Sequence, residues 1–311
     1  MVRIGTSDLD VFALALGGNV FGWTADRESS FAVLDAYVEA GGDFIDTADC
    51  YSAWMPGNSG GESETIIGQW LRSRGHRSRL VIATKVGAHP KFKGLSPQGI
   101  RGAIEQSLRR LQTDYIDLYY THFDQPEIPV EEFLGVLDEL IREGKVRHIG
   151  ASNISVERLA EALKASERDG LAKYVVLQQH YNLMERGLYE GPLAAVVAAH
   201  GLSSAPYYAL ASGFLTGKYR PGTPLDGPRA QEVAPYLEAP RGARVLAVLD
   251  RVAQAHGTDA GAVALAWLAA QPTVATPIAS ARSVSQLSGL LAFTGLILDE
   301  SELRLLSAAS A

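Results

Sequence analysis

Four side chains that can move or hold protons stand at or just beyond the ends of short apolar segments. Asp46 lies in FIDTA, Tyr51 follows five residues later, Lys85 ends LVIATK and His122 ends YIDLYYTH. Each alone has an ordinary structural role as a turn cap, a surface lysine or a rim histidine. A buried lysine or aspartate is costly unless it is paired. Four such residues at matching positions therefore indicate a common site.

This set of residue types suits the reduction of a carbonyl group. The reaction needs a hydride donor on one side of the carbon and a proton donor at the oxygen. Tyr51 can give the proton, and the Lys85 ammonium is expected to lower the phenol pKa from its ordinary value of about 10. Asp46 would keep that ammonium charged and fixed. His122 would orient the carbonyl oxygen by hydrogen bonding.

The elements that must position these residues alternate along the chain. Eight short runs rich in β-branched and aromatic residues predict strands at 12–18, 44–48, 80–85, 115–122, 147–153, 174–182, 203–211 and 273–280. Stretches of helical period predict helices at 29–40, 62–74, 97–111, 130–143, 156–168, 191–200, 241–256, 259–270, 283–292 and 299–309. Residues 220–239, rich in Pro and Gly, are expected to form a long loop.

Strands that alternate with helices predict a parallel sheet. Eight of them in one chain fit a single α/β barrel of the (β/α)8 type, for which about 250 residues is typical. A doubly wound nucleotide fold is the alternative, but no G-x-G-x-x-G follows the first strand. We therefore expect one barrel domain over residues 1–311, with the strand ends and their polar residues on one face.

Composition narrows the function classes. The chain has 311 residues, with 28 basic and 35 acidic side chains and a net charge of −7, so a nucleic-acid partner is not expected. Cys50 is the single cysteine, and no run suits a signal peptide or a membrane span, which fits a cytoplasmic protein without a membrane partner. No spacing resembles a metal site, and nothing marks Cys50 as a nucleophile.

Several longer motifs resemble the aldo-keto reductase superfamily over essentially the whole chain. They are GGDFIDTADCY, ATK, DYIDLYYTHFD, GKVRHIGASN, QQHYNLMER, LASGFLTGKY and TPIASARSVSQL, in that order. The resemblance implies a TIM barrel with an N-terminal β-hairpin and extra C-terminal helices. It also implies that Tyr51 is the general acid, Lys85 lowers its pKa, Asp46 pairs with Lys85, and His122 holds the substrate carbonyl.

The resemblance further implies that NADP(H) binds across the barrel mouth. The residues expected to contact it are Gly18, Asn19, Val20, Asp46, Ser152, Asn153, Gln178, Tyr207, Leu210, Gly213, Lys218, Ser280, Arg282 and Gln286. Arg282 stands at a predicted helix start, where a guanidinium suits a 2′-phosphate. Many relatives carry an acidic residue and Asn where this chain has Gly289 and Leu290, which predicts fewer adenine contacts. Trp23 and Trp54 are expected to line the substrate pocket with Tyr51 and His122.

Other functions stay open at this point. One is a non-catalytic subunit that binds NADPH and acts on a partner protein, as channel-associated relatives do. Another is an unrelated barrel enzyme that uses Lys85 to form a Schiff base. We expect a small-molecule carbonyl substrate and, by default, a monomer, while the sequence leaves the substrate itself unnamed.

Overall fold

Eight parallel strands form the sheet predicted from the sequence. The computed structural model describes residues 1–222 and 224–311, so residue 223, within the predicted loop 220–239, lies outside the description. The strands are hydrogen-bonded in the order β10-β3-β4-β5-β6-β7-β8-β9. Their bounds are Ala15–Gly17 (β3), Phe44–Asp46 (β4), Val81–Val86 (β5), Ile116–Thr121 (β6), Val146–Ser152 (β7), Tyr174–Gln178 (β8), Ser203–Ser204 (β9) and Ile278–Ala279 (β10).

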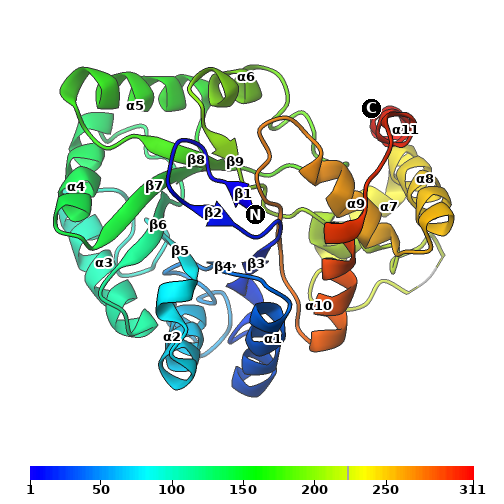
Figure 1. The fold of residues 1–311 in the computed structure, drawn as a ribbon, viewed down its shortest axis with the longest axis horizontal. Coiled ribbons are helices and arrows are strands. Elements are labelled where there is room, and N and C mark those ends of the chain that lie inside the picture. Colours follow the sequence, from blue (N-terminus) through cyan, green and yellow to red (C-terminus); the bar gives the residue numbers. More distant parts are fainter. Residues whose placement is uncertain (223) are drawn as a thin grey trace.

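Hydrogen bonds also join β9, at one end of this order, to the segment that leads into β10, at the other end. The Ser204 amide donates to Thr273 O at 2.7 Å, and the Ala275 amide donates to Ser204 O at 2.9 Å. Helices surround the strands, as Figure 1 shows. The fold is therefore the (β/α)8 fold predicted above.

The predicted helices are confirmed to within two residues at each end. Their bounds are Arg27–Glu39 (α1), Glu62–Arg74 (α2), Pro97–Leu111 (α3), Val130–Arg142 (α4), Val156–Asp169 (α5), Pro192–Ala199 (α6), Pro240–His256 (α8), Ala260–Ala269 (α9), Val284–Leu291 (α10) and Glu300–Ala309 (α11). Local chemistry explains several starts, since Asp26, Ser96, Ser155 and Asp299 each accept a hydrogen bond from a backbone amide of the first turn. Among the described helices, none combines the length and apolar character needed to cross a bilayer.

Two kinds of prediction were wrong. The predicted strands at 203–211 and 273–280 shrink to two residues each, because Pro206 and Pro277 lack the N–H that a ladder needs. The predicted loop 220–239 contains an unforeseen helix, Ala230–Glu238 (α7). Pro235 inside it argues against a helix from sequence alone. Packing outweighs that cost, since Val233 is fully buried and Tyr236 lies against Phe214 at 5.5 Å between ring centroids.

A β-hairpin closes the amino end of the barrel. The side chains of Ile4, Leu9 and Val11 are buried against residues such as Phe44 and Val175 near the starts of strands. Figure 1 shows the hairpin lying across the strands near the N-terminus. Its strands are Val2–Arg3 (β1) and Asp10–Val11 (β2), paired antiparallel. The open end of the barrel is therefore the carboxyl end of the strands.

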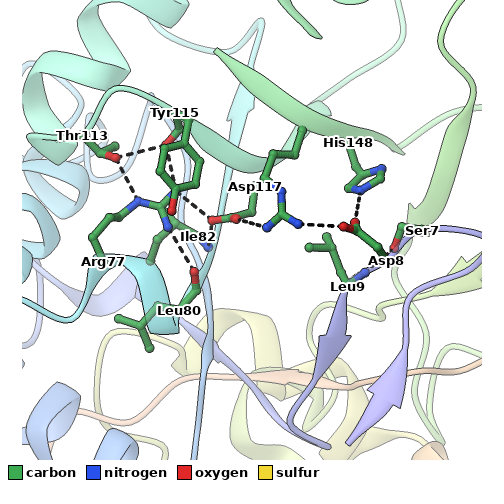
Figure 2. Close-up of polar contacts among 11 residues, drawn as sticks. Ser7, Asp8, Leu9, Arg77, Leu80, Ile82, Thr113, Tyr115, Asp117 and His148 are labelled. Carbon is green, nitrogen blue, oxygen red and sulfur yellow. Dashed lines mark hydrogen bonds and ion pairs between the residues drawn. The ribbon is translucent and has the colours of Figure 1, made fainter. Parts of the chain in front are cut away.

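An ionic network fastens the hairpin to the barrel (Figure 2). Asp117, at the start of β6 and almost fully buried, pairs with Arg77 and Arg147 at 2.8 Å each and accepts a hydrogen bond from the Ile82 amide. Arg147 continues to Asp8 of the hairpin at 3.0 Å. The buried carboxylate thus serves three donors, as its burial requires.

Candidate active site

A cavity of about 1130 Å³ opens at the carboxyl ends of the strands. This is the face on which barrel enzymes carry their sites. The predicted site residues that line it come from most strands and from the loops that follow them. They are Asn19, Val20, Trp23, Asp46, Tyr51, Trp54, His122, Ser152, Asn153, Gln178, Tyr207, Leu210, Gly213, Lys218, Ser280, Arg282 and Gln286.

Gly18 is the predicted cofactor residue that does not line this cavity. A Cβ at Gly18 would lie 2.8 Å from the Ser63 hydroxyl oxygen, so the residue faces the helix behind the wall. Gly17 lines the cavity in its place. The chain turns into a short 3-10 helix, Gly18–Val20, at that point, and the contact of Gly18 with the cofactor stays a prediction.

Lys85 occupies the floor of the site with its side chain fully buried in β5. Its amine donates to Asp46 Oδ2 at 2.6 Å, to the backbone oxygen of Thr47 at 2.8 Å and to the Tyr51 hydroxyl at 3.3 Å. Asp46 Oδ1 accepts a further hydrogen bond from Gln178 at 2.8 Å. All three donor positions of the ammonium are used, which is the condition for burying a charge.

Tyr51 differs from the sequence expectation in one respect. Its pKa lies well above the ordinary value, because burial disfavours the phenolate and the Asp46 carboxylate repels it. We expected Lys85 to lower this pKa. Burial and the repulsion by Asp46 outweigh a lowering by the Lys85 amine, which itself pairs with Asp46 at 2.6 Å. Tyr51 is therefore a neutral phenol at neutral pH, with a hydrogen-bond donor held against its oxygen.

His122 is a neutral imidazole at the wall of the cavity. Its pKa is held well below the ordinary value by burial and by the nearby Lys85 ammonium. The ring stacks on Phe123 at 4.6 Å and meets the Tyr51 ring edge-on at 6.0 Å between centroids. A neutral ring here can donate a hydrogen bond to an oxygen without carrying charge into the pocket.

Three of the residues expected to contact NADP(H), Ser152, Asn153 and Tyr207, are linked to one another. Asn153, in a left-handed conformation with φ 49°, accepts a hydrogen bond from the Tyr207 hydroxyl at 2.7 Å and donates to His122 O at 2.9 Å. Its amide also donates to the Ser152 hydroxyl at 3.0 Å. These contacts fix the amide groups before any ligand arrives, which reduces the ordering cost of binding.

Two cations line the opposite part of the cavity. The Lys218 amine folds over Gly213, where a Cβ would lie 3.1 Å from it and where φ is 92°. Within the described residues, neither Lys218 nor Arg282 has an ion-pair partner that would offset its charge. The Gln286 side chain accepts a hydrogen bond from the Arg282 amide at 2.9 Å, and the Ser283 side chain caps the helix by accepting from the Gln286 amide. This half of the cavity is suited to an anionic group.

Sequence reasoning missed a second group of lining residues. The Arg229 guanidinium lies over the rings of Trp23 and Tyr208, at 4.8 and 5.4 Å from their centroids, and pairs with Glu232 at 2.8 Å. Glu232 also accepts a hydrogen bond from Ser212. Arg229 and Glu232 belong to the segment predicted as a loop, so no periodic signal marked them. The one hint in the sequence was the pair Tyr207–Tyr208, whose second ring contacts Arg229.

Asp49, Cys50 and His122 come together at the cavity floor although no motif joins them. The ligand-type atoms of these three side chains all lie within 4.8 Å of one another. Burial and the neighbouring Asp49 raise the pKa of the Cys50 thiol to about 12, so this cysteine is not an activated nucleophile. This cluster could not be predicted from the sequence, because Cys50 and His122 lie on two loops and are 72 residues apart.

The comparisons with known proteins agree with this geometry. The model of the aldo/keto reductase family matches residues 13–311. The chain belongs to this family. Among the relatives of this chain, Protein tas of Escherichia coli is 32% identical over 92% of this chain and 90% of its own length. Aldo-keto reductase YhdN of Bacillus subtilis is 32% identical over 96% of this chain and 88% of its own.

A third relative carries a different kind of name. It is a probable voltage-gated potassium channel subunit beta of Oryza sativa, 33% identical over 92% of this chain and 88% of its own length. Family membership makes the chain an oxidoreductase of the aldo/keto reductase type and indicates carbonyl reduction in general. The family generally uses a nicotinamide cofactor, without fixing which one for this chain.

Proposed function

We propose that the chain, acting as one domain over residues 1–311, reduces an aldehyde or ketone to an alcohol with NADPH. One observation carries the proposal. The Lys85 amine, charge-paired with Asp46 at 2.6 Å, donates to the Tyr51 hydroxyl at 3.3 Å on the floor of the cavity. The protonated Tyr51 phenol therefore lies beside a space large enough for cofactor and substrate. The Lys85 amine already donates a hydrogen bond to the oxygen that becomes the phenolate.

Bound NADPH supplies the hydride. The chain's own residues supply the proton and hold the carbonyl. The substrate oxygen lies between the Tyr51 hydroxyl and the neutral His122 ring, and Tyr51 transfers its proton as negative charge develops on that oxygen. The phenolate left behind is stabilised by the hydrogen bond from Lys85, and a proton from solvent restores the phenol.

The lining residues support the phosphate form of the cofactor. Asn153 and Gln178 offer amide groups in the cavity, close to His122 and Asp46. Arg282 and Lys218 add positive charge to the lining of the same cavity. The Gly213 backbone leaves room for a diphosphate to approach. Arg282, with no ion-pair partner in the described part of the chain, is the residue we assign to the 2′-phosphate.

The test is a panel of aromatic and aliphatic aldehydes and ketones assayed with NADPH and with NADH. We expect turnover with NADPH to exceed that with NADH. We also expect Arg282→Ala to raise the NADPH Kd by about 30- to 150-fold, from the loss of roughly 2–3 kcal/mol of a charged hydrogen-bonded contact, with little change for NADH. Equal loss for both cofactors, or no turnover over the panel, would refute the proposal.

The channel-subunit relative supports a second candidate, a cofactor-binding regulatory subunit. That protein's role would require tight NADPH binding with negligible turnover and stable association with a partner. Co-purification from the native cell followed by identification of bound proteins separates the two candidates. The neutral Tyr51 and the paired Lys85 favour the enzyme.

A further inference from the structure

We propose that Asp49, Cys50 and His122 form a binding site for Zn²⁺ at the floor of the substrate cavity. The three side chains supply one carboxylate oxygen, one sulfur and one imidazole nitrogen, all within 4.8 Å of one another. Zinc binds this mixture of ligands, whereas Mg²⁺ and Ca²⁺ take oxygen ligands. Asp49 and Cys50 follow β4 and His122 follows β6, and β5 lies between these two strands in the sheet.

Asp49 gives an independent sign that a ligand is missing. The residue is fully buried, and neither oxygen of its carboxylate has a hydrogen-bond partner within the described part of the chain. Buried carboxylates are normally paired or bound to metal. Its backbone is fixed as well, because the Asp49 amide donates to Lys85 O at 3.2 Å. Burial raises the pKa of Asp49 well above its ordinary value, and a cation beside the thiol and the imidazole would stabilise the ionised form of this carboxyl group.

The distances suit tetrahedral zinc. Zn–S bonds of about 2.3 Å and Zn–N bonds of about 2.0 Å place sulfur and nitrogen roughly 3.5 Å apart in a tetrahedron. The Cys50 Sγ to His122 Nδ1 distance is 3.7 Å. Because all three ligand atoms lie within 4.8 Å of one another, side-chain movements of about 1 Å bring them within bonding range of one ion. On binding, the thiol loses its proton to solvent, and one thiolate plus one carboxylate neutralise the ion.

The cavity provides access and a fourth position. Cys50 and His122 both line it, so an ion entering from solvent reaches them and keeps one coordination position open to water. Zinc bound through Nδ1 would fix the imidazole of His122, and its Nε2 stays available to the substrate oxygen that the proposed function assigns to this ring. We therefore infer that zinc changes turnover by fixing this ring; this consequence, unlike metal binding itself, rests on the proposed function.

The test uses Co²⁺ as a spectroscopic probe on the full chain without cofactor or substrate, so it does not depend on activity. We expect a thiolate-to-cobalt charge-transfer band, intense visible bands of a tetrahedral ion, and their loss when Zn²⁺ is added. Cys50→Ser should abolish the charge-transfer band. Asp49→Asn, a nearly isosteric change, should weaken binding by more than the 10- to 100-fold that loss of an outer-shell partner costs.

His76→Ala is the matched control, because His76 lies outside the cavity, and its ring is tilted against that of Trp70 at 5.8 Å between centroids. It should leave the cobalt spectrum and affinity unchanged. The proposal is overturned if no charge-transfer band forms. It is also overturned if the band persists with unchanged affinity in Asp49→Asn, because the metal would then bind the thiol alone.

Discussion

Replacing Lys85 by methionine tests the buried ion pair on which the site is built. Methionine has nearly the same length and volume, so the change removes charge with little cavity. Three hydrogen bonds of the amine disappear, to Asp46, to Thr47 O and to Tyr51. Asp46, 2% exposed, keeps the hydrogen bond from Gln178 but loses its cation. Removal of one partner of a buried pair costs about 3–5 kcal/mol.

The assay is urea unfolding at pH 7 followed by tryptophan fluorescence. We expect the free energy of unfolding of Lys85→Met to fall by those 3–5 kcal/mol, while Lys164→Met on the exposed face of α5 changes it by less than about 0.5 kcal/mol. The double variant Lys85→Met with Asp46→Asn removes both charges and should regain about 2–3 kcal/mol. Turnover should stay at least about 100-fold below that of the unmodified chain in both variants.

If the double variant regains stability but not turnover, the structural role of Lys85 in the ion pair is separated from its role as hydrogen-bond donor to Tyr51. The reasoning is refuted if the single variant loses less than about 1 kcal/mol, since the pair would then be solvated. It is equally refuted if the double variant is no more stable than the single one.

Three further results follow from the structure. Because the pKa of Tyr51 is raised and that of His122 lowered, the reductive kcat should be constant from about pH 6 to pH 8; a midpoint inside that range contradicts the assignment. Because the pKa of His122 is lowered in the folded chain, the unfolded chain takes up a proton at this residue first as the pH falls below the ordinary histidine pKa of about 6.5. The free energy of unfolding should therefore decrease below that pH, which urea midpoints measured from pH 7 to pH 5 will show. Asp117→Leu should cost about 3–5 kcal/mol in urea unfolding, because it strands two arginines and the Ile82 amide. Asp10→Leu, whose side chain is 48% exposed, should cost less than about 1 kcal/mol; equal losses would show that the network in Figure 2 is not what fastens the hairpin.

Much of the fold was predictable because its signals are local. Helical period and capping residues place the helices within two residues, and the apolar runs place all eight strands. Strand length was not predictable at β9 and β10, where Pro206 and Pro277 limit the ladder to two residues. Helix α7 was missed because its stability comes from packing of Val233 and Tyr236, which outweighs the local effect of Pro235.

The candidate site was predictable in composition and less so in electrostatics. Polar residues at the ends of the strands must meet at one face of a barrel, so residues as far apart in the chain as Asp46 and Arg282 line one cavity, as expected. The direction of the Tyr51 pKa shift was not predictable, since it depends on burial and on the repulsion by Asp46. Asp49 and Cys50 meeting His122 is likewise a result of loop geometry.

The most direct measurement is NADPH-dependent turnover of Tyr51→Phe compared with the unmodified chain, with cofactor affinity measured in parallel by quenching of tryptophan fluorescence. We predict a fall in kcat of about 100- to 10,000-fold, the range that a positioned proton donor contributes, with a cofactor Kd within about threefold of the original. Turnover within about threefold of the unmodified chain, at unchanged cofactor affinity, would show that the Tyr51 hydroxyl is not the proton donor.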